Sequence, residues 1–320
     1  MPALEDGLTL FCGPLLLGGY DTALISRSPL LLAPDKMGMN DCVTSPAPRF
    51  TIGETNPDTP TVAPFPLSKK HGKPEGAGEM SAFFEEIDYQ PTPIGAISLR
   101  RRHDVRLRTN ILEIMLGDEH LMSDLFTTSE IALATLGLAY HREQDGDGRQ
   151  LDVVVGGLGL GYTAEAVLHD SCVSSLRVVE ALQAIIEWHE TGLLPLGENL
   201  CADPRCQFVC SDFFACAREG VGFDATQPER RFDAILVDID HAPDFHLTPG
   251  NASFYSAAGL ADLKSHLAEK GVFGLWSNDP PDNSFTAHLR TVFADARAER
   301  VVFTNPYQGN DVTQTIYLAR

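Results

Sequence analysis

The chain of 320 residues is 43% hydrophobic and carries 44 acidic against 24 basic residues, which gives a formal charge of −20. This charge repels nucleic-acid phosphates and anionic lipids, so neither is expected as a partner. No apolar run reaches the length of about 18 residues that a membrane span needs. The apolar stretch 8–17 follows Glu5 and Asp6 instead of basic residues, which argues against a secretory signal.

Seven cysteines are present, an odd number without a C-x-x-C pair. Cys206 and Cys210 have a spacing found among zinc ligands, but they bracket a predicted strand at 207–209, so structural thiols are favoured over a metal. We therefore expect reduced cysteines, no bound metal and a cytoplasmic location.

The first 148 residues fall into two parts. Residues 1–79 hold 11 of the 21 prolines and show no helical or strand period, so we expect a poorly ordered extension. Strand patterns at 95–101 and 111–116, followed by a turn and a return strand ending near 122, predict an antiparallel unit. A helix of about three turns should follow, because 127–130 supplies capping residues and an acid. We expect 80–148 to form a small β-domain with one helix.

From 149 to 320, strands and helices alternate. Strands are expected at 151–155, 176–179, 207–209, 233–237, 272–276 and 300–303, with helices between them. A last strand at 313–318 follows 300–303 without a helix and should therefore run in reverse. This alternation predicts an α/β domain, a parallel sheet covered by helices on both faces. With the reversed seventh strand, it is the Rossmann-like fold of class I adenosylmethionine-dependent transferases.

A glycine turn follows the first of these strands. Gly157, Gly159 and Gly161 form a G-x-G-x-G pattern between a strand and a helix, so backbone can approach a ligand closely there. The pyrophosphate fingerprint needs a further glycine where Tyr162 stands, which makes a dinucleotide the weaker match. Many turns of this kind use glycine only for packing, and that alternative stays open.

Acidic residues end the next two strands. Glu180 ends the second strand, where its carboxylate could accept hydrogen bonds from both ribose hydroxyls of a nucleoside. Asp212 follows the third strand and could accept the exocyclic amine of adenine, or it could cap the next helix. Three successive strand ends thus carry the glycine turn, Glu180 and Asp212. Together they predict an adenosyl site more specifically than any one of these features does alone.

The fourth strand ends in a candidate reactive centre, Asp238, Asp240 and His241. Asp238 comes directly off an apolar strand, so desolvation should raise its pKa and suit it to general-base catalysis. Asp240 and His241 could instead be loop-capping, solvated groups.

These motifs resemble the spermidine synthase-like family over about residues 90–320. The similar segments are the glycine turn with Tyr162 and Thr163, the Val-Val-Glu ending at Glu180, and the stretches 186–189, 237–243, 251–260 and 274–277. The helix start at Ser129 and Glu130 belongs to the same resemblance, because aminopropyltransferases commonly direct a glutamate of this helix at the substrate.

The resemblance implies a group transferase of polyamine biosynthesis. The donor would be decarboxylated S-adenosylmethionine or S-adenosylmethionine, and the acceptor a small amine. Carried over by position, Gly157, Gly159 and Gly161 would line the donor, Glu180 would hold its ribose and Asp212 its adenine. Asp238 would be the catalytic aspartate, with Asp240 and His241 beside it, and Glu130 would face the substrate. A homodimer is one possible assembly.

Two positions depart from the family pattern. Leu160 stands where spermidine synthases usually carry an aspartate near the donor's amino end, and His241 aligns with a second aspartate, although Asp240 lies next door. A methyltransferase using the same adenosyl site is therefore the first alternative. A non-catalytic relative that binds a nucleoside or a partner is the second.

Overall fold

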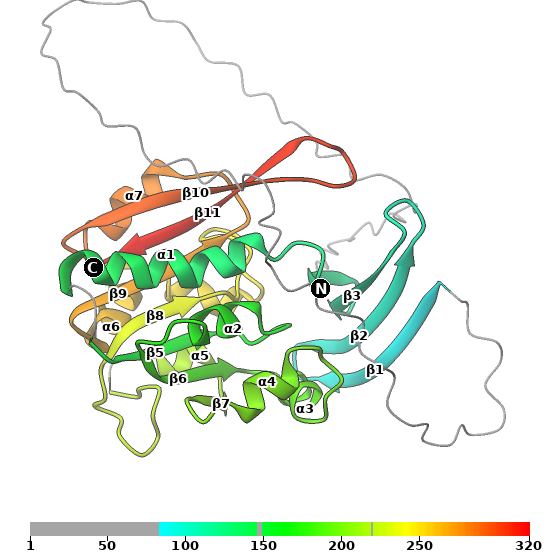
Figure 1. The fold of residues 1–320 in the computed structure, drawn as a ribbon. Coiled ribbons are helices and arrows are strands. Elements are labelled where there is room, and N and C mark those ends of the chain that lie inside the picture. Colours follow the sequence, from blue (N-terminus) through cyan, green and yellow to red (C-terminus); the bar gives the residue numbers. More distant parts are fainter. Residues whose placement is uncertain (1–82, 146–148, 219) are drawn as a thin grey trace, which may run out of the picture. The chain divides into compact units, whose positions relative to one another are not determined.

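Two β-sheets follow one another along the chain (Figure 1). The structure is a computed structural model that describes residues 83–145, 149–218 and 220–320, all of them within one compact unit, Arg49–Arg320. The extension expected at 1–79 lies outside the described residues, and so does part of the linker beside the expected boundary at 148. No helix of the described segments has the length and apolarity to cross a membrane.

The first sheet is antiparallel, with its strands in chain order. Its inner strands are buried over consecutive residues, 97–99 in one and 111–114 in the next. The edge strand β1 was not expected, because its residues are only half-buried and its sequence carries little apolar alternation. The four strands are β1 (Phe84–Thr92), β2 (Gly95–Asp104), β3 (Thr109–Leu116) and β4 (Glu119–Ser123).

The second sheet has seven strands in the order β10-β11-β9-β8-β5-β6-β7. Strands β5 to β9 pair in parallel, whereas β11 is antiparallel to both of its neighbours. The Rossmann-like fold with a reversed last strand, as predicted, is thereby confirmed. Its strands are β5 (Leu151–Gly156), β6 (Val173–Glu180), β7 (Cys206–Cys210), β8 (Phe232–Val237), β9 (Leu267–Ser277), β10 (Ala296–Thr304) and β11 (Asp311–Ala319).

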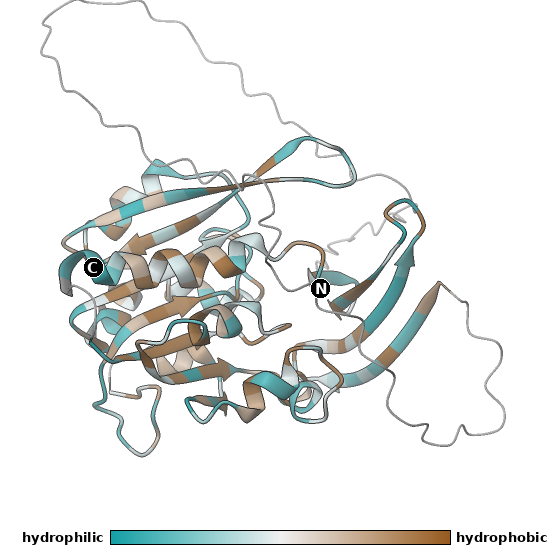
Figure 2. Cartoon of the chain, viewed as in Figure 1, coloured by the Kyte–Doolittle hydropathy of each residue, from teal (hydrophilic) through white to brown (hydrophobic). Residues whose placement is uncertain are grey.

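Hydrophobic residues fill both faces of this sheet, and its central strands are apolar along most of their length (Figure 2). Val153 and Val155 of β5 belong to the core on one face, and Val154 belongs to the core on the other. Such strands show no alternation of polar and apolar residues, because both faces are covered by helices.

Helices cover the sheet. The first, α1 (Thr128–Asp145), packs against β8, β9, β11 and the second helix. It is longer than the three turns expected, because Tyr140 and His141 are still buried in its last turns. The short helix α4 was not expected, since it begins at a glycine and has no side-chain cap. The others are α2 (Tyr162–Leu168), α3 (Gln183–Glu190), α4 (Gly197–Ala202), α5 (Phe213–Cys216), the 3₁₀ helix η1 (Pro249–Ser253), α6 (Ala257–Ser265) and α7 (Asn283–Leu289).

Candidate functional site

The residues predicted from the sequence meet at one edge of the second sheet. Gly156, the last residue of β5, pairs with Val179 of β6 on one side and with Val237 of β8 on the other. The glycine turn, Glu180 and Asp238 therefore leave three adjacent strands at the same level. The carboxyl ends of parallel strands are where α/β sheets bind ligands.

The glycine turn has a left-handed backbone at all three of its glycines, with φ of 90° at Gly157, 47° at Gly159 and 95° at Gly161. A Cβ at Gly157 would lie 2.2 Å from the backbone oxygen of Asp238. A side chain at Gly157 would collide with the protein itself, so packing explains much of the need for glycine there. This was the alternative to close approach of a ligand. The same packing fixes the loop that carries Asp238 directly against the turn.

Glu180 is buried and ties two turns together. One oxygen of its carboxylate accepts the amide of Leu158 at 3.0 Å, and the other accepts the amide of Leu182 at 2.8 Å. Burial raises the pKa of Glu180, against the effect of these amides. Because a carboxylate offers about four acceptor positions, each oxygen keeps one for a further donor such as a hydroxyl.

Asp212 lies at the end of the next strand, and its side chain is exposed. Its Oδ1 caps α5 by accepting the amides of Phe214 at 2.9 Å and Ala215 at 3.3 Å. The capping role that the sequence left open is therefore real. The other oxygen accepts no hydrogen bond from the described residues and stays available to a ligand.

Asp238 and Glu130 are brought together by Thr163. The Thr163 hydroxyl donates to Oδ2 of Asp238 at 2.8 Å, and the hydroxyl oxygen of Thr163 lies 3.4 Å from the backbone carbonyl oxygen of Glu130. Burial raises the pKa of both carboxyl groups, and the charge of Asp238 raises that of Glu130 further. Both acids were predicted from the sequence, but neither their pairing nor a role for Thr163, which stands two residues after Gly161, was.

Asp240 and His241 point away from Asp238. The Asp240 carboxylate is 1% exposed and accepts three hydrogen bonds, from the Leu247 amide at 2.6 Å, the Asn251 side chain at 2.8 Å and the Tyr255 hydroxyl at 2.8 Å. These three hydrogen bonds give Asp240 the loop-capping role that was the alternative to a catalytic one. The His241 ring stands 5.0 Å from the Phe245 ring, and its Nε2 lies 2.8 Å from the Glu119 carboxylate, which joins this loop to β4.

Met122 of β4 touches the tip of the glycine turn. Its sulfur accepts the Leu160 amide at 3.2 Å, and a Cβ at Gly159 would lie 2.3 Å from that sulfur. Leu160 itself is 2% exposed. Apolar groups thus surround the tip of the turn. Met122 connects the turn to the first sheet, and no local sequence pattern indicates this contact.

A cavity of about 590 Å³ opens beside the loop that follows Asp238. Three carboxylates line it together with aromatic rings. Burial and the neighbouring charge of Asp244 raise the pKa of Asp279. Its walls come from the loops after β8 and β9, from α7 and from β11, and include Asp244, Asp279, Asp282, Phe285, His288 and Tyr317.

Solved structures with this arrangement of sheets identify the fold. A spermidine synthase from Thermotoga maritima matches with a TM-score of 0.54 and 18% identity over 73% of this chain and 72% of that chain. A spermidine synthase in complex with the transition state analogue AdoDATO matches with a TM-score of 0.55 and 18% identity over 73% of each chain. The chain has the spermidine synthase fold. No protein-family model matches the sequence, and no curated protein sequence matches it.

The residues at the strand ends of this spermidine synthase fold suit an adenosyl ligand. Glu180 retains acceptor positions for two hydroxyls, and the unused oxygen of Asp212 can accept an amine. Phe213, the first residue of α5, is buried with its ring against Gly156 and gives the site an apolar wall. Among the described residues, no group of three or more His, Cys, Asp or Glu side chains is arranged to hold a metal ion.

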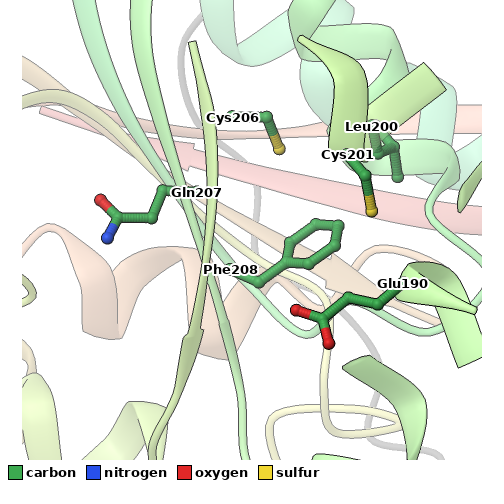
Figure 3. A pocket seen from close by; sticks show the side chains of 6 residues that line it. All are labelled: Glu190, Leu200, Cys201, Cys206, Gln207 and Phe208. Atoms are coloured by element: carbon green, nitrogen blue, oxygen red, sulfur yellow. The ribbon is translucent and has the colours of Figure 1, made fainter. Parts of the chain in front are cut away.

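A second cavity, of about 380 Å³, lies away from these residues (Figure 3). It is bounded by α3, α4 and β7, and none of the predicted site residues lines it. Cys201 and Cys206 are both free thiols, and burial raises the pKa of Cys206 to about 12. The lining residues are Glu190, Leu200, Cys201, Cys206, Gln207 and Phe208.

Proposed function

We propose that the protein transfers an aminopropyl or related group from an adenosyl sulfonium donor to an amine. The observation that carries this proposal is Asp238, a partly buried carboxylate next to the glycine turn, held by the Thr163 hydroxyl and with a raised pKa. A base at this position stands beside the strand ends that suit a nucleoside. Its pKa lies closer to neutral pH than that of an ordinary aspartate, as general-base catalysis requires.

The donor proposed is decarboxylated S-adenosylmethionine or S-adenosylmethionine. Glu180 would hold the ribose through its remaining acceptor positions, and Asp212 would hold the adenine amine. Gly157, Gly159 and Gly161 would let the backbone approach the ligand. When bound, the donor would supply a carbon made electrophilic by its positive sulfur.

The acceptor proposed is a small amine. The cavity lined by the loop that follows Asp238 supports this, because Asp244, Asp279 and Asp282 line it and carboxylates suit a protonated amine. The formal charge of −20 acts in the same direction by attracting cations. Glu130, which lies beside Thr163 as Asp238 does, is proposed to face the same substrate.

Asp238 would act on the acceptor nitrogen. A protonated amine cannot attack, so its N–H proton must first pass to a base, and the Asp238 carboxylate is the group that would accept it. Thr163 would keep that carboxylate turned towards the nitrogen by donating to Oδ2. Asp240 would serve the reaction indirectly, because its three hydrogen bonds hold the loop in place, and His241 would fix this loop to β4.

Methyl transfer is the second candidate, favoured by one observation. The tip of the glycine turn offers Leu160 and the Met122 sulfur, and no carboxylate, to the part of the donor beyond the nucleoside. A donor whose ammonium needs a charged partner at this point would lack one. A cytoplasmic location and a homodimer remain predictions from the sequence.

Calorimetry with three ligands tests the proposal. Binding of decarboxylated S-adenosylmethionine in preference to S-adenosylmethionine would support aminopropyl transfer, and the reverse order would support methyl transfer. Binding of methylthioadenosine alone, without turnover of any diamine or monoamine acceptor, would favour a non-catalytic nucleoside-binding protein. No binding of any of the three would contradict the proposal.

A further inference from the structure

Two acidic residues from distant parts of the chain, Glu130 and Asp238, both lie beside the Thr163 hydroxyl. Glu130 lies in the first turn of α1, and Asp238 follows β8. The helix α1 packs against both β8 and α2. The Thr163 hydroxyl of α2 lies 2.8 Å from the Asp238 carboxylate and 3.4 Å from the backbone carbonyl of Glu130, and the charge of Asp238 acts on the Glu130 carboxyl group. Glu130 is 7% exposed, so its carboxyl group is largely shielded from water.

Among the described residues, no ion pair compensates the charge of Glu130 or Asp238. Within the described part of the chain, neither Glu130 nor Asp238 forms an ion pair, and both take a hydrogen bond from a neutral hydroxyl: Ser129 donates to Glu130 at 2.8 Å, as Thr163 does to Asp238. The titratable groups around them are acidic as well. Burial and the charges of Asp124, Glu165 and Glu130 raise the pKa of the Tyr162 phenol of α2. Within the part of the chain that the structure describes, the main influences on the pKa of Glu130 and Asp238 include no basic group.

We infer that Glu130 and Asp238 share one proton, which Glu130 holds in the resting protein while Asp238 is the ionised base. Two like charges in a poorly solvated site, without a cation, cannot both be favourable, so one of the acids must remain neutral. Glu130 is the better holder of the proton, because it is the more deeply buried of the two and glutamate has the higher ordinary pKa.

The catalytic meaning of this pair rests on the proposed function. Glu130 would act through Asp238 as a positioning residue that keeps the charge of the site at one negative unit. An arriving ammonium would lose one N–H proton to Asp238, which frees the lone pair of the nitrogen and leaves both acids neutral. The proton would pass from Asp238 to solvent when the product leaves, and Glu130 would keep its own proton throughout.

Carboxyl titration by ¹³C NMR on the full chain tests the shared proton without any substrate. In the wild-type protein, Glu130 should titrate well above the ordinary glutamate range of about 4.3. In Asp238→Asn the neighbouring charge is absent, so the midpoint of Glu130 should fall by about one pH unit or more. In Glu130→Gln the upper titration should disappear while that of Asp238 persists.

Glu165→Gln is the matched control, because it removes an acid from α2 without touching the pair, and it should leave the Glu130 midpoint where it was. Circular dichroism checks that each variant is folded. The inference is overturned if Glu130 titrates in the ordinary range, or if its midpoint is the same in the wild-type protein and in Asp238→Asn.

Activity is a separate readout. If the proposed reaction occurs, the pH–rate profile of Glu130→Gln should lack the change in rate that accompanies Glu130 ionisation at higher pH in the wild-type protein. If no acceptor is ever turned over but the two acids titrate as described, the proposed function fails and the shared proton stands. If turnover occurs and the titrations are ordinary, the shared proton fails alone.

Discussion

Asp238 and Asp240 are separated by a single residue, yet their surroundings are opposite. Asp240 accepts three hydrogen bonds from its own loop, whereas Asp238 accepts one, from Thr163. From the sequence, both could be recognised as strand-end acids. Their roles could not be separated, because the donors Asn251 and Tyr255 reach Asp240 only after the loop has folded back on itself.

Replacing these two aspartates should therefore have different effects on stability. Asp240→Asn should lower the free energy of unfolding by about 1–3 kcal/mol, because buried donors lose a charged acceptor. Asp238→Asn, the matched control, should leave it equal or higher at neutral pH, since the raised pKa of Asp238 means that its ionised form is unfavourable in the folded state. Chemical denaturation measures both. Equal losses would contradict the assignment of Asp240 to loop structure.

Glu180 is predicted to serve the glycine turn and the ligand together. Glu180→Gln places the NH₂ group of a carboxamide against the backbone amide of Leu158 or Leu182, so one of these hydrogen bonds is lost and the turn should loosen. An adenosyl ligand should then bind more weakly by about 1–3 kcal/mol. Asp212→Asn keeps the oxygen that caps α5 and should preserve the melting temperature. Calorimetry and thermal melts decide. Unchanged ligand affinity in Glu180→Gln would remove Glu180 from the site.

At the scale of elements, the sequence predicted the second sheet well and the first sheet in part. Buried parallel strands are continuous apolar runs in the sequence, and their alternation with helices predicts that they pair in parallel. The half-exposed edge strand β1 and the short, uncapped α4 carry weaker local signals and were not predicted. The contact of Met122 with the glycine turn joins two sheets, so no pattern within either one indicates it.

The glycine turn allows a matched test at this scale. Gly157 and Gly192 both have positive φ, 90° and 74°, but a Cβ at Gly157 would collide with the Asp238 backbone, while one at Gly192 would meet nothing within 4 Å. Gly192→Ala should thus cost only the backbone strain, about 1 kcal/mol. Gly157→Ala should cost more and should displace Asp238. Equal losses in chemical denaturation would show that the turn does not press on the Asp238 loop.

For the whole molecule, acids with raised pKa decide how stability depends on pH. Burial raises the pKa of Glu130, Asp238 and Glu180, so each binds a proton more tightly in the folded than in the unfolded chain. Their contribution to stability is complete below the unfolded pKa and is lost as pH rises through the folded pKa. Acids with lowered pKa, such as Asp224 beside Arg230, act in the opposite direction and lose their contribution as pH falls.

These three acids should accordingly make the free energy of unfolding decrease between about pH 5 and pH 8, whereas the lowered pKa of His120 and His189 acts in the opposite direction near their ordinary range. Denaturant midpoints at several pH values measure this slope. The double variant Glu130→Gln/Asp238→Asn should have a shallower slope, because two of the acids responsible are removed. Identical slopes in the double variant and the wild-type protein would mean that both acids are fully ionised in the folded chain.

The central claim is that Asp238 is the base of a transfer from an adenosyl sulfonium to an amine, and Asp238→Asn tests it most directly. The asparagine keeps the shape of the side chain and removes the base. Turnover should fall by a factor of roughly 10²–10⁴, while donor affinity measured by calorimetry stays near the wild-type value. Normal turnover by the variant, with any acceptor that the wild-type protein uses, would contradict the claim.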